Sequence, residues 1–431
     1  MESIVQTAVQ KMNNELYTAA VIAFRRNMMN YLISAYSVNP YKGSEDSIGW
    51  NWVLQYEKNY KGGDRIILLT KKFNEKDTRK GLKEFNIQHV ELVVVDVPDA
   101  LNWFREKYSA FHHMYYILWQ HWAWLWVKHS RIHFDVIHHV TMNDYRIPSE
   151  LYKDKGAKVI WGPMGGAQVT PKSLKIYEKN QLVADFREFV NKSCSWNPFY
   201  KKALCSYYKI YCINNETQKQ ISNIVGENVP LMPELALRDE YKNLSIQERN
   251  NDIFKIVFVG RLIGKKGVAF LVDTLSLMPT DMDWELLIFG DGDDRALIEK
   301  QIADSGIGKN VKLMGNRPLN QIAEAYQQAD VFVLPSLRET SGNVLLEAMA
   351  YAVPIVAFDT SFCRLLKEVD CGIFVNTDQT LDDIKADYCN AIVTLGQDKE
   401  LAKQMGLNGY KYVNKHLTWE AKYNAILKDF L

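Results

Sequence analysis

The segment from Val331 to Ala357, VFVLPSLRETSGNVLLEAMAYAVPIVA, constrains the fold of this chain more than any other stretch. An apolar run at 331–334 meets a Pro-Ser break and a short polar loop. A helical pattern then begins near Gly342, and a second apolar run covers 354–357. This order predicts a strand, a loop, a helix and a strand of a parallel sheet, a unit that binds ligands in the loops at the carboxyl ends of its strands.

Two glutamates flank the loop of this unit. Glu339 and Glu347 lie eight positions apart, one before the helix and one about a turn inside it. The backbone amides of Gly342, Asn343 and Val344 are expected at the helix N-terminus, where free N–H groups attract an anion. Two carboxylates and a set of amides can hold three parts of one ligand, and a sugar hydroxyl, a diphosphate and a ribose fit them.

Three segments together resemble the retaining glycosyltransferases of family 4, which have two Rossmann domains in the architecture called GT-B. The unit with the two glutamates resembles the E-x7-E element of that family. Residues 259–262 (VGRL) and 265–267 (KKG) resemble its Gly-Arg-Leu and Lys-Gly phosphate segment. Residues 39–52 (NPYKGSEDSIGWNW) resemble the Gly-Ser-Glu-Pro-Gly-x-Gly-Trp loop of one subgroup, with Asp-Ser where that subgroup has Pro-Gly.

The chain is expected to form two α/β domains, each with a doubly wound sheet, that face each other across a cleft. Its 431 residues suit two domains of roughly 200 residues each. We expect an N-terminal extension at 1–28, a Rossmann-like acceptor domain at 29–240, a linker at 241–252 and a Rossmann-like nucleotide-sugar-binding domain at 253–416. The resemblance implies that a last helix, within 417–431, crosses back to the first domain.

Apolar runs and helical periodicity alternate in both halves of the chain. Strands are expected at 31–36, 65–70, 89–97, 134–140, 158–163, 209–214, 255–260, 285–292, 311–315, 331–334 and 354–357. Helices are expected at 45–60, 74–84, 100–130, from 216, at 267–277, 293–305, 319–328, from 342 and at 418–430. Residues 1–28 precede the first strand, and the sequence leaves open whether they are an extra helix or a start assigned too early.

The composition fits a globular protein of the cytoplasm. Apolar residues make up 47% of the chain and charged residues 24%, and the six cysteines form no CxxC pair, which is typical of reduced thiols. The sequence has no run of about 18 uncharged apolar residues, so no membrane span is expected. The first 28 residues lack the apolar core of a signal peptide. We expect a cytoplasmic protein that works at the inner face of the membrane.

The net charge of +1 is unevenly distributed. Residues 1–250 carry 33 basic and 26 acidic residues, a charge of +7, which leaves −6 for the remainder. A basic N-terminal half suits an anionic partner such as a phospholipid surface or a lipid-diphosphate acceptor, and chance asymmetry is the alternative interpretation. Nucleic acid is not expected as a partner, because no helix or loop carries a dense Lys/Arg run.

Arg261 and Lys266 follow a predicted strand and are within reach of one diphosphate. A departing diphosphate needs preorganised cations and amides, and we expect these two residues and the helix tip at Gly342 to act without a metal ion or a cofactor. Two solvated basic residues at a helix end are the alternative. The resemblance assigns the ribose hydroxyls to Glu347, and the hydroxyls and anomeric charge of the transferred sugar to Glu339.

Three further sites are expected near the donor. Gly43 lies in the turn after the first strand, where backbone can approach phosphates, or it is an ordinary turn glycine. Residues 289–292 (FGDG) resemble the family's Gly-x-Gly turn beside the nucleotide base, which assigns Gly290 to the donor. His138 and His139 end a strand, and adjacent strand residues face opposite ways. The resemblance implies one histidine near the sugar and acceptor, and only one of the two can face the cleft. His138 is expected there as a catalytic residue, and His139 is placed on the acceptor side.

Other residues are expected on the acceptor side. Residues 161–166 (WGPMGG) resemble the subgroup's Trp-Gly-Pro-x-Gly-Gly loop, which places Trp161 and Gly162 there. Glu45 either faces the acceptor or begins the next helix. The chain departs from the family at 351–354, where a glycine is usual, and at 359–362, where a Gly-Gly turn is usual. These departures affect the loop that faces the sugar and the acceptor more than the diphosphate site.

An aromatic segment at 102–130 allows two interpretations. Aromatic side chains with flanking basic residues suit a helix at a bilayer surface, and packing against the N-terminal sheet also explains many of them. The large aromatic residues of this segment are Trp103, Phe104, Trp119, Trp122, Trp124 and Trp126.

Together these patterns predict a retaining hexosyltransferase-type enzyme. The expected partners are a nucleotide sugar, a glycan or lipid-linked acceptor in cell-surface or exopolysaccharide synthesis, and the membrane surface as a peripheral contact. A glycosidase pair of glutamates has no need of a diphosphate site, so no covalent glycosyl-enzyme is expected. A GT-B phosphorylase or nucleotide-sugar epimerase is the second interpretation, and a non-catalytic protein that binds a sugar nucleotide or glycan is the third.

Overall fold

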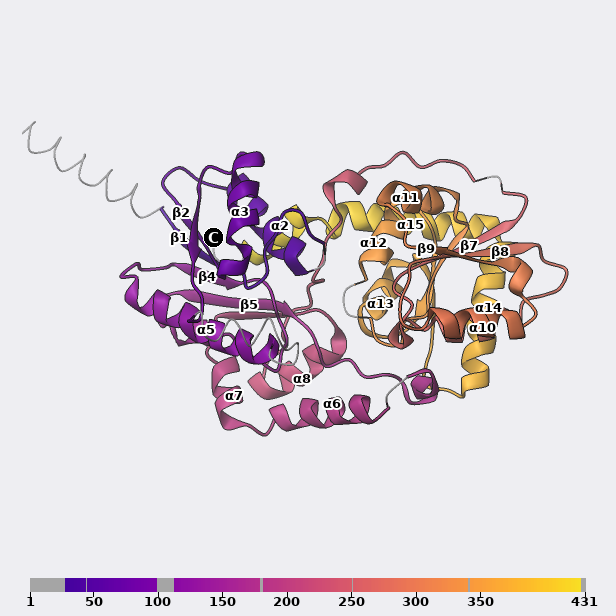
Figure 1. Ribbon diagram of the computed structural model, residues 1–431, viewed down its shortest axis with the longest axis horizontal. Helices are drawn as coiled ribbons and strands as arrows, with labels where there is room; N and C mark the ends of the chain where they lie inside the picture. The colour runs from indigo at the N-terminus through magenta and orange to yellow at the C-terminus, as the bar shows by residue number, and fades with distance from the viewer. Residues whose placement is uncertain are drawn as a thin grey trace, which may run out of the picture. The chain divides into compact units, whose positions relative to one another are not determined.

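The protein is described here from a computed structural model, in which residues 28–43, 45–98, 112–178, 181–249, 251–339 and 342–427 are placed. These residues contain two six-stranded parallel sheets covered by helices, as Figure 1 shows. The α/β fold with two doubly wound sheets, predicted from the alternation of apolar runs and helices, is confirmed.

The first sheet has the strand order β3-β2-β1-β4-β5-β6. The chain moves outward from β1 to β3 and then returns to the other side of β1, so the connection direction reverses between β1 and β4. Ligands of open parallel sheets bind at such a reversal, beside the carboxyl ends of the strands. The strands are β1 (Asn30–Ser34), β2 (Arg65–Thr70), β3 (Val90–Val94), β4 (Val136–His139), β5 (Lys158–Met164) and β6 (Lys209–Cys212).

The second sheet repeats this order, as β12-β11-β10-β7-β8-β9. Its reversal lies between β7 and β10, which pair in parallel through Val331 with Ile256 and Phe332 with Val257. The loops that follow these two strands therefore begin side by side. The strands are β7 (Phe254–Val259), β8 (Trp284–Phe289), β9 (Val311–Gly315), β10 (Val331–Leu334), β11 (Ile355–Phe358) and β12 (Gly372–Val375).

The second sheet forms because its central strands are apolar on both faces. Ile256, Phe258 and Val333 pack into one apolar cluster, and Val257 and Phe332 pack into another. Since successive strand residues point to opposite faces, the two clusters lie on opposite sides of the sheet. Every residue of β10 and β11 is buried, which agrees with their uninterrupted apolar runs.

Helices connect the strands and cover both sheets (Figure 1). Those before β7 are α2 (Glu45–Lys58), α3 (Lys72–Glu84), α5 (His112–His129), α6 (Gln181–Cys194), α7 (Pro198–Leu204) and α8 (Asn215–Val225), with short 3-10 turns η2 (Glu150–Lys153), η3 (Lys172–Tyr177) and η4 (Asp239–Tyr241). Those after β7 are η5 (Gly264–Lys266), α9 (Val268–Leu275), α10 (Arg295–Asp304), η6 (Gly308–Asn310), α11 (Leu319–Gln328), α12 (Asn343–Ala350), α13 (Ser361–Leu366), η7 (Lys367–Val369), α14 (Leu381–Gln397), α15 (Lys399–His416) and α16 (Trp419–Leu427).

The aromatic helix α5 packs through part of its tryptophans. Trp119 is fully buried and its indole N–H donates to the carbonyl oxygen of Val95 at 2.8 Å. Trp122, Trp124 and Trp126 are half-buried. Packing thus accounts for Trp119, whereas Trp103 and Phe104 lie outside the described residues. No helix among the described residues is long and apolar enough to cross a bilayer.

The chain divides into two compact units. One contains the described residues up to Asn143 together with Ser149–Trp161 and Ser206–Lys209. The other contains Asp144–Pro148, Gly162–Cys205 and everything from Ile210 onward. Within the second unit the predicted last helix is present as α16. Its first turn is tied to the segment before η4, since Thr418 forms a β-bridge with Leu237 and the Lys422 ammonium donates to the carbonyl oxygen of Glu234.

Candidate functional site

The loops that follow β7 and β10 touch at the crossover of the second sheet. Gly267 has a left-handed φ of +70°, and a Cβ added there would lie 1.9 Å from the carbonyl oxygen of Pro335. The amide of Leu337 donates to the carbonyl oxygen of Lys265 at 2.9 Å. Only glycine permits so close an approach of the two backbones. The contact fixes the side chains that these loops carry relative to each other.

Lys266 and Glu339 are the side chains that this contact brings together. The Lys266 Nζ lies 2.6 Å from Glu339 Oε2, and the two side chains are 18% and 8% exposed. The amide of Gly342 donates to Glu339 Oε1 at 3.3 Å. Gly342 has a φ of +57° and directly precedes α12, so Glu339 also lies at the helix N-terminus. The sequence predicted all three residues at one ligand site, and the structure places them in contact.

Burial opposes ionisation of Glu339, but its surroundings reverse the effect. The charge and hydrogen bond of Lys266, with further hydrogen bonds such as that from Gly342, outweigh the desolvation, so the pKa of Glu339 lies below its ordinary value. Glu339 is therefore a carboxylate at neutral pH. A fixed negative charge in a buried position can stabilise a cationic centre that comes close to it.

Positive charge is concentrated around this carboxylate. Burial lowers the pKa of Lys265, and the charges of Lys266, Arg261 and Arg338 lower it further against the opposing effect of Glu339. Arg261 is exposed and is the second residue of the loop after β7. The cations disfavour one another, so a bound anion such as a diphosphate would relieve their repulsion. The predicted pair Arg261 and Lys266 thus belongs to one electropositive surface.

Glu347 has a different environment from Glu339. It lies inside α12, is 8% exposed, and accepts a hydrogen bond from the Tyr326 hydroxyl at 3.4 Å. Burial raises its pKa although the charge of Arg238 and the Tyr326 hydrogen bond lower it. The Tyr326 ring stacks on Tyr351 with centroids 5.8 Å apart. The two glutamates therefore have opposite pKa shifts, which is typical of carboxylates with different tasks.

The segments 351–354 and 359–362, where the chain departs from the family pattern that it resembles, each contain a residue with a left-handed backbone. Ala352 has a φ of +53° and Ser361 a φ of +51°. The amide of Ser361 donates to Glu216 Oε1 at 3.1 Å. Non-glycine residues in this conformation are strained by roughly 1–2 kcal/mol, and such strain gathers near functional sites. Each of the two segments thus contains a residue in a backbone conformation that glycine adopts more easily.

Gly290 has a structural reason to be glycine. Its φ is +131°, and a Cβ would lie 2.0 Å from the carbonyl oxygen of Gly260. A Cβ at Gly292 would lie 2.4 Å from the carbonyl oxygen of Leu262. The loop after β8 therefore packs directly on the loop that carries Arg261. The role of Gly290 beside a nucleotide base stays a prediction.

Both histidines of β4 are fully buried within the first unit. The Tyr56 hydroxyl lies 3.4 Å from His138 Nδ1, and the Trp52 ring meets the His138 ring edge-on. His139 is hydrogen-bonded on both nitrogens, to the hydroxyls of Ser34 at 2.9 Å and Tyr116 at 2.8 Å. Burial, and then the charge of His138, lower the pKa of His139 to about 3. A substrate role for either imidazole requires a movement of these covering side chains and stays a prediction.

The other residues expected near the donor or acceptor have local contacts of their own. Glu45 begins α2 and accepts a hydrogen bond from the amide of Met142, and burial raises its pKa. Trp161 is buried and stacks on Tyr207 with centroids 5.1 Å apart. A Cβ at Gly162 would lie 2.5 Å from the carbonyl oxygen of Tyr211, whereas one at Gly43 would meet nothing within 4 Å. Their substrate contacts also stay predictions.

Sequence reasoning missed a second polar region, which lies in the same compact unit as Glu339. It is a hollow lined by Gln168, Val169, Thr170, Lys175, Arg187, Glu188 and Arg338. Arg338 directly precedes Glu339 and pairs with Glu178 at 2.9 Å. Burial lowers the pKa of Arg187, and the charges of Arg146 and Arg338 lower it further. The residues that line this hollow come from segments far apart in the sequence, so no local pattern could have identified them.

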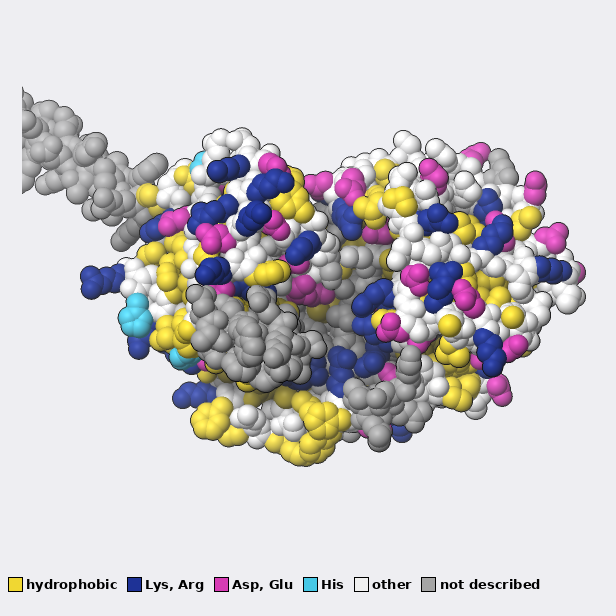
Figure 2. Space-filling model, viewed as in Figure 1, with side chains coloured by type: hydrophobic (Ala, Val, Ile, Leu, Met, Phe, Trp, Pro, Cys, Tyr) yellow, Lys and Arg dark blue, Asp and Glu magenta, His cyan; other side chains and the backbone are white. Residues whose placement is uncertain are grey.

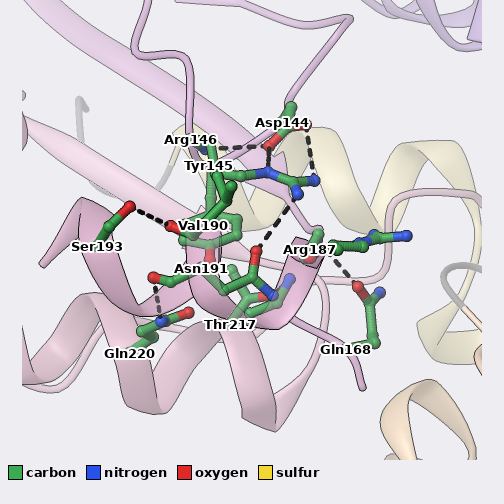
Figure 3. A network of polar contacts seen from close by, with 12 residues as sticks. Asp144, Tyr145, Arg146, Gln168, Arg187, Val190, Asn191, Ser193, Thr217 and Gln220 are labelled. Atoms are coloured by element: carbon green, nitrogen blue, oxygen red, sulfur yellow. Dashed lines mark hydrogen bonds and ion pairs between the residues drawn. The ribbon is translucent and has the colours of Figure 1, made fainter. Parts of the chain in front are cut away.

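Figure 3 shows how Arg146 organises this region. Its guanidinium pairs with Asp144 at 2.8 Å and donates to Asn191 Oδ1 at 3.3 Å. Arg187, from the same helix as Asn191, donates to the carbonyl oxygen of Gly166 at 3.2 Å. The network thus ties α6 to the loop after β5, beside the loop that carries Glu339.

Comparisons with known proteins agree with this geometry. Residues 253–398 match the family described as Glycosyl transferases group 1. An uncharacterised glycosyltransferase of Methanocaldococcus jannaschii is 24% identical over 301 residues, which span 67% of this chain and 79% of that protein. The capsular polysaccharide biosynthesis glycosyltransferase CapM of Staphylococcus aureus is 28% identical over 189 residues, 42% of this chain and 48% of that protein.

Among solved structures, HepE of Anabaena in complex with UDP has a TM-score of 0.59 and 14% sequence identity, and the match covers 94% of this chain and 100% of that one. This similarity confirms the GT-B fold. With the family match over the second sheet, the comparisons support a glycosyltransferase.

Proposed function

We propose that the chain is a retaining glycosyltransferase of family 4 that moves a sugar from a nucleotide-diphosphate sugar to a glycan or lipid-linked acceptor, in cell-surface or exopolysaccharide synthesis. One observation supports the proposal most strongly: the ion pair of Lys266 and Glu339, 2.6 Å long, lies where the loops after β7 and β10 meet. A cation, a carboxylate and a helix N-terminus at one crossover suit a ligand that carries both phosphates and hydroxyls.

In the proposed reaction, Arg261 and Lys266 stabilise the negative charge that develops on the departing diphosphate. The backbone amides at the start of α12 add partial positive charge that also stabilises the diphosphate. These groups do what a metal ion does in other transferases, so we propose that no metal takes part.

The two glutamates contact different parts of the donor in this mechanism. Glu339, held ionised, faces the transferred sugar and stabilises the positive charge that grows on its anomeric carbon. Glu347 accepts hydrogen bonds from the ribose hydroxyls. The acceptor hydroxyl attacks from the face that the diphosphate leaves, and its proton passes to the departing phosphate oxygen. The anomeric configuration is retained without a covalent glycosyl-enzyme.

Replacement of the ion pair tests this function. Lys266→Ala and Glu339→Gln should each lower kcat/KM for transfer from a labelled nucleotide sugar by about a hundredfold, the size of effect that loss of one transition-state charge contact produces. Lys300→Ala, which removes an exposed lysine from α10, is the matched control and should transfer at the wild-type rate. Unchanged turnover in both site variants would contradict the mechanism.

Two other functions are separated by the products. A GT-B phosphorylase or nucleotide-sugar epimerase would change the donor without a glycan acceptor, whereas the proposed transferase forms a glycoside only when an acceptor is present. A non-catalytic protein would bind the donor tightly and turn over none. Product analysis with and without acceptor therefore distinguishes all three. The acceptor class proposed here is supported by the similarity to CapM, whose name places it in capsular polysaccharide biosynthesis.

A further inference from the structure

Three N–H groups without an acceptor belong to the hollow that Arg338 lines, next to the loop that carries Glu339. The Gln168 side-chain Nε2 and the Nε atoms of Arg187 and Arg338 are buried and have no hydrogen-bond partner among the described residues. All three side chains line the hollow, and Gln168 is only 2% exposed. A buried donor without a partner costs stability, and a ligand that supplies an acceptor removes that cost. The hollow therefore favours a ligand rich in acceptor oxygens.

The backbone of Gly166 holds two of these side chains. Its carbonyl oxygen accepts from Arg187 Nη2 at 3.2 Å, and its amide donates to Gln168 Oε1 at 3.0 Å. Gly166 has a φ of +122°, and a Cβ there would lie 3.1 Å from Arg146 Nη2, so this backbone is itself packed closely. Figure 3 shows Arg187 and Gln168 on the same side of Arg146. These contacts fix both side chains and leave Gln168 Nε2 and Arg187 Nε for a ligand.

Arg187 is the cation of this region that has no carboxylate partner. Arg338 pairs with Glu178 at 2.9 Å, and Lys175 pairs with Asp185 at 2.8 Å. No carboxylate among the described residues forms an ion pair with Arg187. Its positive charge is therefore available to an anion that enters the hollow.

The cations near the hollow repel one another. Burial lowers the pKa of Arg187, and the charges of Arg146 and Arg338 lower it further against the opposing charge of Asp144. The charge of Arg338 also contributes to the lowered pKa of Lys265. Figure 2 shows Lys and Arg side chains gathered on the surface between α6 and α13. A bound anion would relieve this repulsion.

An oxyanion fits the hollow better than water or a neutral hydroxyl. Water and hydroxyls bring a donor with each acceptor, and no lining residue has a buried side-chain acceptor atom without a partner. A carboxylate or a phosphate only accepts, and the guanidinium forks of arginine match its oxygens. Two acidic groups lie close: Glu188 lines the hollow with its carboxylate 4.0 Å from Lys175 Nζ, and Glu178, whose Oε2 has no partner, does not line it.

We propose that this hollow binds a carboxylate or phosphate group of a sugar substrate. We call Gln168, Arg187 and Arg338 the anion pocket. Arg338 directly precedes Glu339, which faces the transferred sugar in the proposed function, so the charged group belongs to the donor sugar or to the acceptor that attacks it. The inference rests on the proposed function and deepens it, because it makes one of the two sugar substrates acidic.

Ligand pairs that differ by one charged group test the proposal on the full chain and separate the two sources. UDP-glucuronate against UDP-glucose tests the donor sugar. Methyl glucuronide and glucose 6-phosphate against methyl glucoside test the acceptor, with UDP present so that the diphosphate site is occupied. Calorimetric titration measures each Kd. In one of the two arms the wild type should bind a charged member about tenfold or more tightly than the neutral one, as expected for hydrogen bonds to a charged group.

Variants of the anion pocket should remove this preference. Arg187→Met, which keeps the length of the side chain, should weaken binding of the charged member about tenfold or more and leave the neutral member unchanged. Arg187→Lys keeps the charge but loses the fork and should retain part of the preference. Gln168→Met should lower the preference about three- to tenfold, as for a hydrogen bond from a neutral group. Lys172→Ala, which removes an exposed lysine of η3, is the matched control and should keep the full preference.

The proposal is overturned if the wild type binds the charged and neutral members equally in both arms. It is also overturned if Arg187→Met keeps the preference, or if the control loses as much of it as the pocket variants do.

Failure of this proposal and failure of the proposed function are distinguishable. In the proposed function the diphosphate binds through Arg261 and Lys266, so Arg187→Met should bind UDP with wild-type affinity. A wild type that binds UDP and shows no preference for a charged sugar loses only the anion pocket. A wild type that binds no nucleoside diphosphate contradicts the proposed function and the anion pocket with it.

Discussion

At the scale of single residues, the two glutamates of the loop and helix after β10 belong to one motif but have different surroundings and opposite pKa shifts. Glu339 is paired with Lys266 and its pKa is lowered, whereas Glu347 is buried beside Tyr326 and its pKa is raised. The sequence predicted Glu339 and Gly342 together because they lie three positions apart, and the family resemblance added Lys266, which is 73 residues away from Glu339. It did not predict Arg338 or Arg187, whose contacts join segments far apart in the chain.

His139 makes the free energy of unfolding depend on pH in the acid range. Its pKa is about 3 in the folded state and about 6.5 when unfolded. Between these values the unfolded chain binds a proton that the native state does not, so stability falls as the pH falls, by about 1.4 kcal/mol per pH unit. His139→Gln should flatten the dependence of the unfolding free energy on pH between these limits. The same slope in both proteins would contradict the assignment.

The burial of His138 and His139 also shows a limit of sequence reasoning. Alternation along a strand tells which residues share a face, and it correctly separates the two rings. It does not tell that both faces of β4 are covered, by Trp52 and Tyr56 near one ring and by Tyr116 near the other. Those covering residues come from helices at other places in the sequence.

At the scale of elements, the strands that were predicted well are those with uninterrupted apolar runs. β10 was predicted at its observed bounds, since all four of its residues are apolar and buried. β12 was missed, because its short sequence GIFV is half-exposed at the edge of the sheet. α6 and α7 were missed because their exposed residues Phe186, Phe189 and Phe199 obscure the usual periodicity of a surface helix.

The contact between the loops after β7 and β10 depends on Gly267. Gly267→Ala should destabilise the fold by about 3 kcal/mol or more, because its Cβ would lie 1.9 Å from a backbone oxygen. Gly226→Ala is the matched control: its φ of +83° is also left-handed, but nothing lies within 4 Å of its Cβ. It should lose only about 1 kcal/mol. Denaturant unfolding of both variants measures the difference, and equal losses would show that the loop contact is not tight.

At the scale of the whole molecule, the same strand order occurs in both sheets, and each reverses its connections between its first and fourth strand. The two-sheet α/β fold was predictable because alternation of strands and helices leaves few topologies open. The division into compact units was not readable from the sequence, since the units exchange short segments near Asp144–Pro148 and Ser206–Lys209. Those exchanges depend on contacts between distant parts of the chain.

Donor binding should stabilise the whole protein by mass action. At a nucleoside diphosphate concentration a hundred times its Kd, the free energy of unfolding should rise by about 2.7 kcal/mol. A panel of nucleoside diphosphates screened by thermal unfolding identifies the base that the site prefers. No increase in Tm with any member of the panel would contradict a nucleotide-sugar donor.

The central claim is that a diphosphate binds where the loops after β7 and β10 meet. Calorimetric titration of the preferred nucleoside diphosphate against the wild type, Arg261→Ala and Lys266→Ala tests it most directly, with Lys300→Ala as control. The account predicts that each site variant binds about ten- to a hundredfold more weakly, as expected for loss of a hydrogen bond to a charged group, and that the control binds normally. Wild-type affinity in both site variants would contradict it.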